Sequence, residues 1–193
     1  MPGSCDRTRR AAVARFISPS FDSAVTGYFG TRGPSVSEAE GAHAAYVAAL
    51  RAHGTEVTVL PALAEHPDCC FTEDTAVIVG DVAVIPNMGH PSREGEQEAV
   101  VEHLSGRYEI DRMPKGSTLD GGDVVFYDDR YLIGVSTRTN RIGADYLASR
   151  VREADYHVEL VDVPGSTLHL TTVMSSPREG TVIAAEGHLT QAQ

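Results

Sequence analysis

The order of predicted strands and helices repeats along this 193-residue chain, and the repeat constrains the fold more than any other feature. Residues 75–79 and 82–86 are short β-branched runs on either side of Gly80-Asp81, a pattern typical of a β-hairpin. A helical pattern and a short strand follow, and the same order returns about 48 residues later. The sequence therefore predicts an α/β fold built from strand–strand–helix–strand units. The other segments assigned to these units are strands at 57–60, 107–110 and 158–163, a second hairpin at 123–127 and 130–135, and a third at 168–174 and 181–185.

Each predicted helix begins after a residue whose side chain suits a helix N-cap. The three capping positions are Ser35 or Ser37, Ser92, and Thr139-Asn140. The second helix is expected over residues 93–104, with its early glutamates near the positive end of the helix dipole.

Composition excludes several classes of protein. With 16 Lys and Arg against 27 Asp and Glu, the net charge is −11, so the chain lacks the basic surface that nucleic acids and anionic membranes attract. Hydrophobic residues make up 41% of the chain, which is enough for a core. We expect a small-molecule ligand and neither a nucleic-acid nor a membrane partner, and the acidic balance is compatible with a cationic ligand.

The length suits a single domain spanning residues 1–193. After the third hairpin the repeat requires another helix, which the residues after 185 are too few to form. We therefore expect an α/β domain that is incomplete at its C-terminus, with exposed strand edges that favour a homodimer. Three cysteines, Cys5, Cys69 and Cys70, are too few for a disulfide framework and indicate a reducing, cytoplasmic setting.

The segment that leads into each hairpin is rich in polar and ionisable side chains. If the units are related by rotation about one axis, these three segments converge and their polar groups form one site. The first segment holds Asp68, Glu73 and Asp74, and such a carboxylate cluster can bind a planar guanidinium through paired charge-assisted hydrogen bonds. A metal is the alternative ligand, but Cys69-Cys70 is a weak match to a zinc site, so we expect no metal.

The second and third segments add groups suited to acid–base chemistry. Residues 120–123, Asp-Gly-Gly-Asp, are typical of a tight turn, although the glycines would also let a ligand approach the backbone. His169 alternates with apolar neighbours in a predicted strand, and an acid such as Asp120 could fix its tautomer and raise its pKa. Arg93 and Arg138 each lie where a hairpin leads into its helix, a position suited to binding a carboxylate.

Five motifs along the chain resemble those of one enzyme family. In order they are PDCCFTEDTAVI, GHPSREGE, LDGGDVVF, STRTNRIGAD and LHLTTVMSS, and the similarity extends over residues 12–185. They closely resemble dimethylarginine dimethylaminohydrolase, in the guanidine-modifying amidinotransferase superfamily. The resemblance implies a pentein-like α/β propeller of ββαβ repeats around a pseudo-fivefold axis. It also implies hydrolysis of N-methylated arginine to citrulline and a methylamine, with no organic cofactor.

The same resemblance implies a role for each candidate residue. His169 would be the proton donor of the reaction, and Asp120 would orient it. A loop over residues 18–35, which contains Tyr28 and Phe29, resembles the family's substrate lid. The arginines would hold the α-carboxylate of the substrate or shape its pocket. The implied substrate-binding residues are Asp68, Glu73, Asp74, Arg93 and Arg138.

The family uses a cysteine thiolate near its C-terminus as the nucleophile, and this chain has no cysteine after Cys70. Cys69 and Cys70 lie in a motif where the family's cysteine is not the nucleophile. We therefore expect the chain as given to be inactive while keeping part of the ligand pocket. Two alternatives stay open, an enzyme similar to arginine deiminase or amidinotransferase, and a non-catalytic guanidinium-binding protein.

Overall fold

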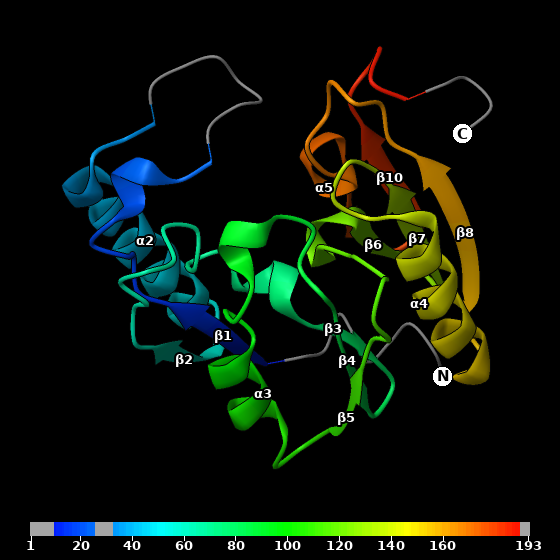
Figure 1. The fold of residues 1–193 in the computed structure, drawn as a ribbon, viewed down its shortest axis with the longest axis horizontal. Helices are drawn as coiled ribbons and strands as arrows, with labels where there is room; N and C mark the ends of the chain where they lie inside the picture. The colour runs from blue at the N-terminus through cyan, green and yellow to red at the C-terminus, as the bar shows by residue number, and fades with distance from the viewer. Residues whose placement is uncertain (1–9, 26–32, 190–193) are drawn as a thin grey trace.

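The computed structural model describes residues 10–25 and 33–189, which form an α/β fold of small separate sheets (Figure 1). Two ββαβ units are complete, and in each the third strand runs parallel to the second strand of an antiparallel hairpin. The first unit consists of β3 (Val77–Val79), β4 (Val82–Ile85), α3 (Glu98–Leu104) and β5 (Glu109–Arg112). The second consists of β6 (Val124–Tyr127), β7 (Arg130–Val135), α4 (Arg141–Glu153) and β8 (His157–Asp162). The repeat predicted from the sequence is confirmed in both units.

Partial units precede and follow these two (Figure 1). β1 (Ala11–Arg15), α2 (Val36–Ala52) and β2 (Glu56–Leu60) form a parallel β–α–β unit. β9 (Met174–Arg178) and β10 (Thr181–Ala184) form an antiparallel hairpin. The predicted α/β class is confirmed, whereas the pseudo-fivefold axis stays a prediction.

Two of the three predicted helix caps are confirmed. Ser35 caps α2 in a capping box with Glu38, in which each side chain bonds the backbone N–H of the other residue. Asn140 caps α4 by accepting the Gly143 N–H at 2.8 Å.

The helix expected over residues 93–104 is shorter than predicted. It begins only at Glu98, because Gly95 has a φ of +96°, a left-handed conformation that interrupts a helix. Pro91–Arg93 forms a separate 3-10 turn, η3, so Ser92 caps no α-helix. This break lets Arg93 point into the protein, where it is only 3% exposed.

The third hairpin begins later than the prediction of a strand over 168–174. Leu170–Val173 forms a short helical turn, α5, and β9 starts at Met174. His169 therefore lies in extended backbone just before a turn, and not inside a strand. The carboxylate of Asp123 accepts the Leu170 N–H at 3.0 Å, which favours the turn at this point.

The main hydrophobic core lies between the two complete units and includes the fully buried side chains of Ile133, Leu147 and Val151. The first partial unit has a smaller buried cluster, made of Ala14, Val47 and Val57. The hairpin strands that follow the turns of the site in the two complete units are therefore held by the larger core. Within the described residues, no helix combines the length and the hydropathy needed to cross a membrane.

Candidate active site

Three helical turns, one at the start of each hairpin, form the centre of the site. η2 (Thr72–Thr75) precedes β3, η4 (Gly121–Asp123) precedes β6, and α5 precedes β9. η2 packs against η4, and η4 packs against α5. The three polar segments therefore converge, as the repeat predicts.

A buried aspartate links each of these turns to the next one. The Gly122 N–H donates to Asp74 Oδ1 at 2.7 Å, and the Leu170 N–H donates to Asp123 Oδ1 at 3.0 Å. Donor and acceptor are 48 residues apart in the first bond and 47 in the second, so the two bonds are equivalent in the repeat. Both aspartates are buried.

Gly121 and Gly122 allow η4 to pack directly against its neighbours. A Cβ atom on Gly121 would lie 2.1 Å from the carbonyl oxygen of Glu73. A Cβ atom on Gly122 would lie 2.8 Å both from an Asp74 carboxylate oxygen and from the His169 ring. The two glycines therefore make room for protein groups of the site, a reason that turn geometry alone does not provide.

Arg93 directs its guanidinium toward protein acceptors. Nη1 forms an ion pair with Asp74, and Nε and Nη2 bond the buried carboxylate of Glu96 at 2.7–3.2 Å. Nη2 also donates to the carbonyl oxygens of Phe71 and Asp68, at 3.0 and 3.3 Å. Arg93 thus holds the first polar segment in place and fixes the second oxygen of Asp74.

Arg138 pairs with the other candidate acid. Its Nη1 lies 3.2 Å from Oδ2 of Asp120, whose Oδ1 accepts the Gly89 N–H at 2.7 Å. Asp120 is fully buried and Arg138 is 7% exposed. Within the described residues, Asp120 is the acid that the Arg138 guanidinium contacts, so its remaining N–H donors are available to a ligand.

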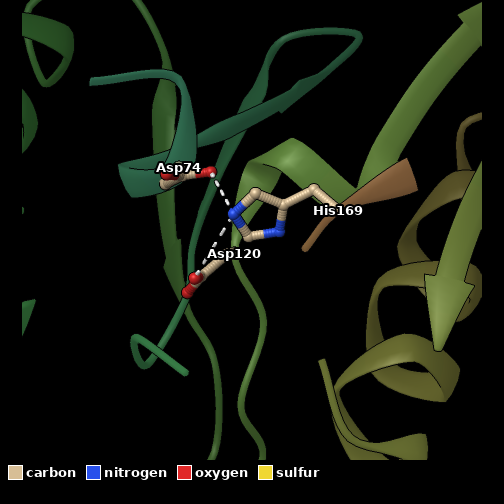
Figure 2. A group of neighbouring side chains, drawn as sticks. All are labelled: Asp74, Asp120 and His169. Atoms are coloured by element: carbon tan, nitrogen blue, oxygen red, sulfur yellow. Dashed lines mark ion pairs between the residues drawn. The ribbon is translucent and has the colours of Figure 1, made fainter. Parts of the chain in front are cut away.

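His169 brings these groups together (Figure 2). Its Nε2 lies 3.9 Å from Asp74 Oδ1 and 3.9 Å from Asp120 Oδ2, within ion-pair distance of both but longer than a hydrogen bond. Nδ1 points away from both carboxylates and lies 3.7 Å from Asp123 Oδ2. The structure therefore places Asp120 on the Nε2 side of the ring and Asp123 on the Nδ1 side.

His169 and Asp74 line a cavity of about 460 Å³. Asp68 lines it and accepts the Val25 N–H through its carboxylate at 3.2 and 3.3 Å, which fixes one end of the loop expected to act as a lid. Tyr28 and Phe29 of that loop lie outside the described residues. The remaining polar side chains of the lining are those of Glu73, Asp74, Arg93, Arg138, His169 and Thr171.

Glu73 differs from the other acids because its side chain is exposed at the cavity. Within the part of the chain that the structure describes, its carboxylate makes no hydrogen bond and no ion pair. Partial desolvation of the carboxylate by the surrounding protein, followed by the charge of Asp74, raises the pKa of Glu73 above its usual range. A cation bound beside Glu73 would relieve this unfavourable charge.

The electrostatics of His169 favour the imidazolium. Burial alone lowers the pKa of His169, but the carboxylates of Asp123, Asp74 and Asp120 outweigh it and leave that pKa raised. Burial, followed by the charge of Asp74, raises the pKa of Asp120. A histidine that holds its proton near neutral pH can act as a general acid.

Neither of the two described cysteines lines the cavity that contains His169. Cys69 is fully buried, with its Sγ 3.4 Å from the Leu63 N–H. Cys70 lines a second, larger cavity of about 790 Å³, whose wall is chiefly apolar and which shares Phe71 and Glu73 with the first. Burial, followed by the charges of Cys69 and Asp68, raises the pKa of the Cys70 thiol to about 12, so the reactive thiolate is disfavoured.

A metal ion could in principle contact the same groups that surround Nε2. One ligand atom from each of Asp74, Asp120 and His169 lies within 4.8 Å of the others. However, every carboxylate oxygen of Asp74 and Asp120 already accepts a donor, from the backbone N–H of Gly122 or Gly89 or from the guanidinium of Arg93 or Arg138. The donor set therefore suits a hydrogen-bonding ligand better than a metal ion.

Three residues of the site were not among the sequence candidates. They are Asp123 beside Nδ1 of His169, Glu96 beneath Arg93, and Gly122 against Asp74. Asp123 and Gly122 lie within the Asp-Gly-Gly-Asp run, and the repeat that aligns Asp74 with Asp123 was the signal that could have found the aspartate. Glu96 lay in a predicted helix, where an exposed glutamate is usual.

Solved structures share this fold over most of the chain. A mutant dimethylarginine dimethylaminohydrolase from Pseudomonas aeruginosa, complexed with citrulline, matches with a TM-score of 0.86 and 27% sequence identity. The match covers 91% of this chain and 69% of that chain. The fold and the site thus define a class, the pentein-type enzymes of the amidinotransferase superfamily.

Sequence comparison identifies the family within this class. An uncharacterized protein from Aeropyrum pernix is 35% identical over 97% of this chain and 70% of its own length. The N(G),N(G)-dimethylarginine dimethylaminohydrolases of Pseudomonas aeruginosa and Streptomyces coelicolor are 29% and 34% identical, and the chain covers 60% and 55% of their lengths. The family model described as N,N dimethylarginine dimethylhydrolase, eukaryotic, matches residues 35–193. The chain belongs to the dimethylarginine dimethylaminohydrolase family.

Proposed function

We propose that the cavity binds an N-methylated arginine, with the guanidinium between Glu73 and Nε2 of His169. Family membership supports this substrate, and a solved relative is a complex with citrulline. Glu73 offers the guanidinium an exposed carboxylate, and Asp74 lies beside it with Oδ1 directed toward Nε2. A carboxylate pair of this kind suits the planar, charged guanidinium.

The observation that carries the proposal is the excess of carboxylates around the cavity. Among the described residues that line the cavity, the cationic side chains are those of Arg93, Arg138 and His169, and both arginines are already paired with acids. A guanidinium beside Glu73 would reduce the net negative charge. The carboxylates in and behind the cavity are Asp68, Glu73, Asp74, Glu96, Asp120 and Asp123.

The two arginines receive different roles in this proposal. Arg138 has donors directed at the cavity and would hold the α-carboxylate of the substrate. Arg93 has Asp74, Glu96 and two carbonyl oxygens as its acceptors, so it would shape the pocket by holding Asp74.

The reaction proposed for the site is hydrolysis of the guanidino C–N bond to citrulline and a methylamine. His169 would protonate the departing amine through Nε2, on the side of the ring where Asp74 and Asp120 lie, and would then take a proton from the attacking water. The thiolate that family resemblance assigns to the nucleophile is not supplied by Cys69 or Cys70. We therefore propose that the 193-residue chain binds the substrate without releasing citrulline.

Calorimetric titration with dimethylarginine, together with a colorimetric assay for citrulline, tests this function. We expect saturable binding, a loss of affinity of about tenfold or more in Glu73→Gln, and no citrulline. Glu102→Gln, an exposed glutamate on α3, serves as the matched control and should bind as the unchanged chain does. Absence of binding by a folded sample would overturn the proposed substrate, and equal affinity for arginine and dimethylarginine would favour a deiminase. Release of citrulline would contradict the proposed lack of turnover.

The cytoplasmic location and the homodimer expected from the sequence stay predictions.

A further inference from the structure

Asp74 and Asp123 occupy equivalent positions in the repeat, yet only Asp74 lines the cavity. Each accepts an N–H of the next turn through Oδ1. Asp74 then directs its carboxylate to Arg93 and the cavity. Asp123 has no access to the cavity, so its burial and its contacts require another explanation.

The carboxylate of Asp123 is fully buried and held on several sides. Oδ2 accepts hydrogen bonds from the hydroxyls of Ser136 and Thr139, both at 2.6 Å. Oδ1 accepts the N–H of Leu170, the residue directly after His169. Asp123 therefore has one defined orientation and also fixes the backbone on which His169 stands.

The Nδ1 atom of His169 is buried and has no hydrogen-bond partner within the described residues. The carboxylate nearest to it is Oδ2 of Asp123, at 3.7 Å, and a small ring rotation would bring the two into hydrogen-bond distance. A carboxylate beside one ring nitrogen favours a proton on that nitrogen and leaves the other nitrogen free for chemistry. Here the free nitrogen is Nε2, on the side of the ring where Asp74, a residue of the cavity lining, lies.

Within the described residues, the other acids near the ring lie on a different side of it. Asp74 from η2 and Asp120 from the residue before η4 both face Nε2, and Glu73 lies at the cavity. These three influence the charge of His169, but none of them faces Nδ1. Asp123, the second acid of the Asp-Gly-Gly-Asp run, is therefore the one placed to orient the ring through Nδ1, whereas Asp120 acts on Nε2.

We infer that Asp123 is the positioning residue of His169, holding the imidazole as the Nδ1–H tautomer with Nε2 directed at the substrate. The catalytic role of that orientation rests on the proposed function, whereas the orientation itself does not depend on it. It gives the two equivalent aspartates different tasks, since Asp74 faces the ligand and Asp123 faces the proton donor.

Nuclear magnetic resonance of chain labelled with ¹⁵N-histidine tests the inference without substrate, because long-range ¹H–¹⁵N spectra identify the tautomer and follow the pKa of each histidine. In the unchanged chain we expect neutral His169 to carry its proton on Nδ1. In Asp123→Asn we expect loss of that preference and a fall in the pKa of His169, with exposed His53 unaffected. Asp81→Asn, in the exposed turn of the first hairpin, should change neither quantity.

A purely structural role for Asp123 would lower the stability of the variant and leave the tautomer and pKa of His169 as they are, which would overturn the inference. An Nε2–H tautomer in the unchanged chain would overturn it as well.

If the Asp123→Asn variant does not fold, the Thr139→Val variant tests the inference instead. Removal of one hydroxyl from Oδ2 should strengthen the interaction with Nδ1 and raise the pKa of His169, and an unchanged pKa would contradict the inference. A correct tautomer without dimethylarginine binding would refute the proposed function alone.

Discussion

The turns η2 and η4 show how one repeated element acquires two different tasks. In both, a buried aspartate accepts an N–H of the following turn, at 2.7 Å for Asp74 and 3.0 Å for Asp123. The second oxygen differs, because Asp74 pairs with a guanidinium whereas Asp123 accepts two hydroxyls. The repeat thus supplies the position of each carboxylate, and the side chains that meet its second oxygen decide what it can bind.

The largest effect is expected where the two turns touch. In Gly121→Ala the new Cβ would lie 2.1 Å from the Glu73 carbonyl oxygen, a backbone atom that cannot rotate away. We expect a loss of about 4 kcal/mol in the free energy of unfolding, beyond the usual overpacking cost of about 1–3 kcal/mol. Urea denaturation measures it, with Gly165→Ala as control because a Cβ there meets no atom within 4 Å. Equal stability of the two variants would show that the turns are not packed as described.

A smaller difference should separate the two aspartates. Asp74→Asn removes one of the two carboxylates that pair with buried Arg93, which should cost about 3 kcal/mol. Asp123→Asn should cost about 2 kcal/mol, because the amide oxygen still accepts the Leu170 N–H and the hydroxyls can reorient. Chemical denaturation of both variants at one pH measures the order. A greater loss in the free energy of unfolding for Asp123→Asn than for Asp74→Asn would contradict the different roles given to the two aspartates.

The raised pKa of His169 gives a modest dependence of stability on pH. The folded chain keeps the imidazole proton to a higher pH than the unfolded chain, whose histidine pKa is about 6.5. This contribution to the free energy of unfolding is therefore present below about pH 6.5 and is lost as the pH rises through the folded pKa. In His169→Asn the fall in stability over that range should be weaker. Identical slopes in denaturation series of both proteins would contradict the raised pKa.

The smallest effect is expected from Cys70, which lies close to η2 in sequence but lines the other cavity. With a thiol pKa of about 12, it should react slowly with iodoacetamide at pH 8 in the folded chain and rapidly after unfolding. Cys70→Ser should leave dimethylarginine binding unchanged. Rapid alkylation of the folded chain, located at Cys70 by mass spectrometry, would contradict the raised pKa of this thiol and make Cys70 a candidate nucleophile.

Much of the fold could be predicted from local signals. The hairpin around Gly80-Asp81 and the cap at Asn140 follow from turn and capping chemistry, and both are present. β1 was missed because three of its five residues are alanine, which is depleted in strands. The first strand of the third hairpin was predicted too early, because the bond from Leu170 to Asp123 is a tertiary contact that local propensity does not contain.

The candidate site was predictable in its residue types but not in its pairing. Asp68, Glu73 and His169 line one cavity, as their positions in the repeat suggest. The burial of Arg93 against Glu96 depends on the break at Gly95, which the helical pattern over 93–104 concealed. The side of the ring on which Asp120 and Asp123 lie depends on side-chain geometry, which spacing cannot specify.

The central claim is that a guanidinium binds beside Nε2 of His169, and the resonances of that histidine test it most directly. Addition of dimethylarginine to ¹⁵N-histidine-labelled chain should shift the His169 signals saturably and lower the pKa of His169, because a bound cation opposes the imidazolium. His53 should not respond. Unchanged His169 signals at ligand concentrations that saturate the calorimetric titration, or equal shifts at both histidines, would contradict the account.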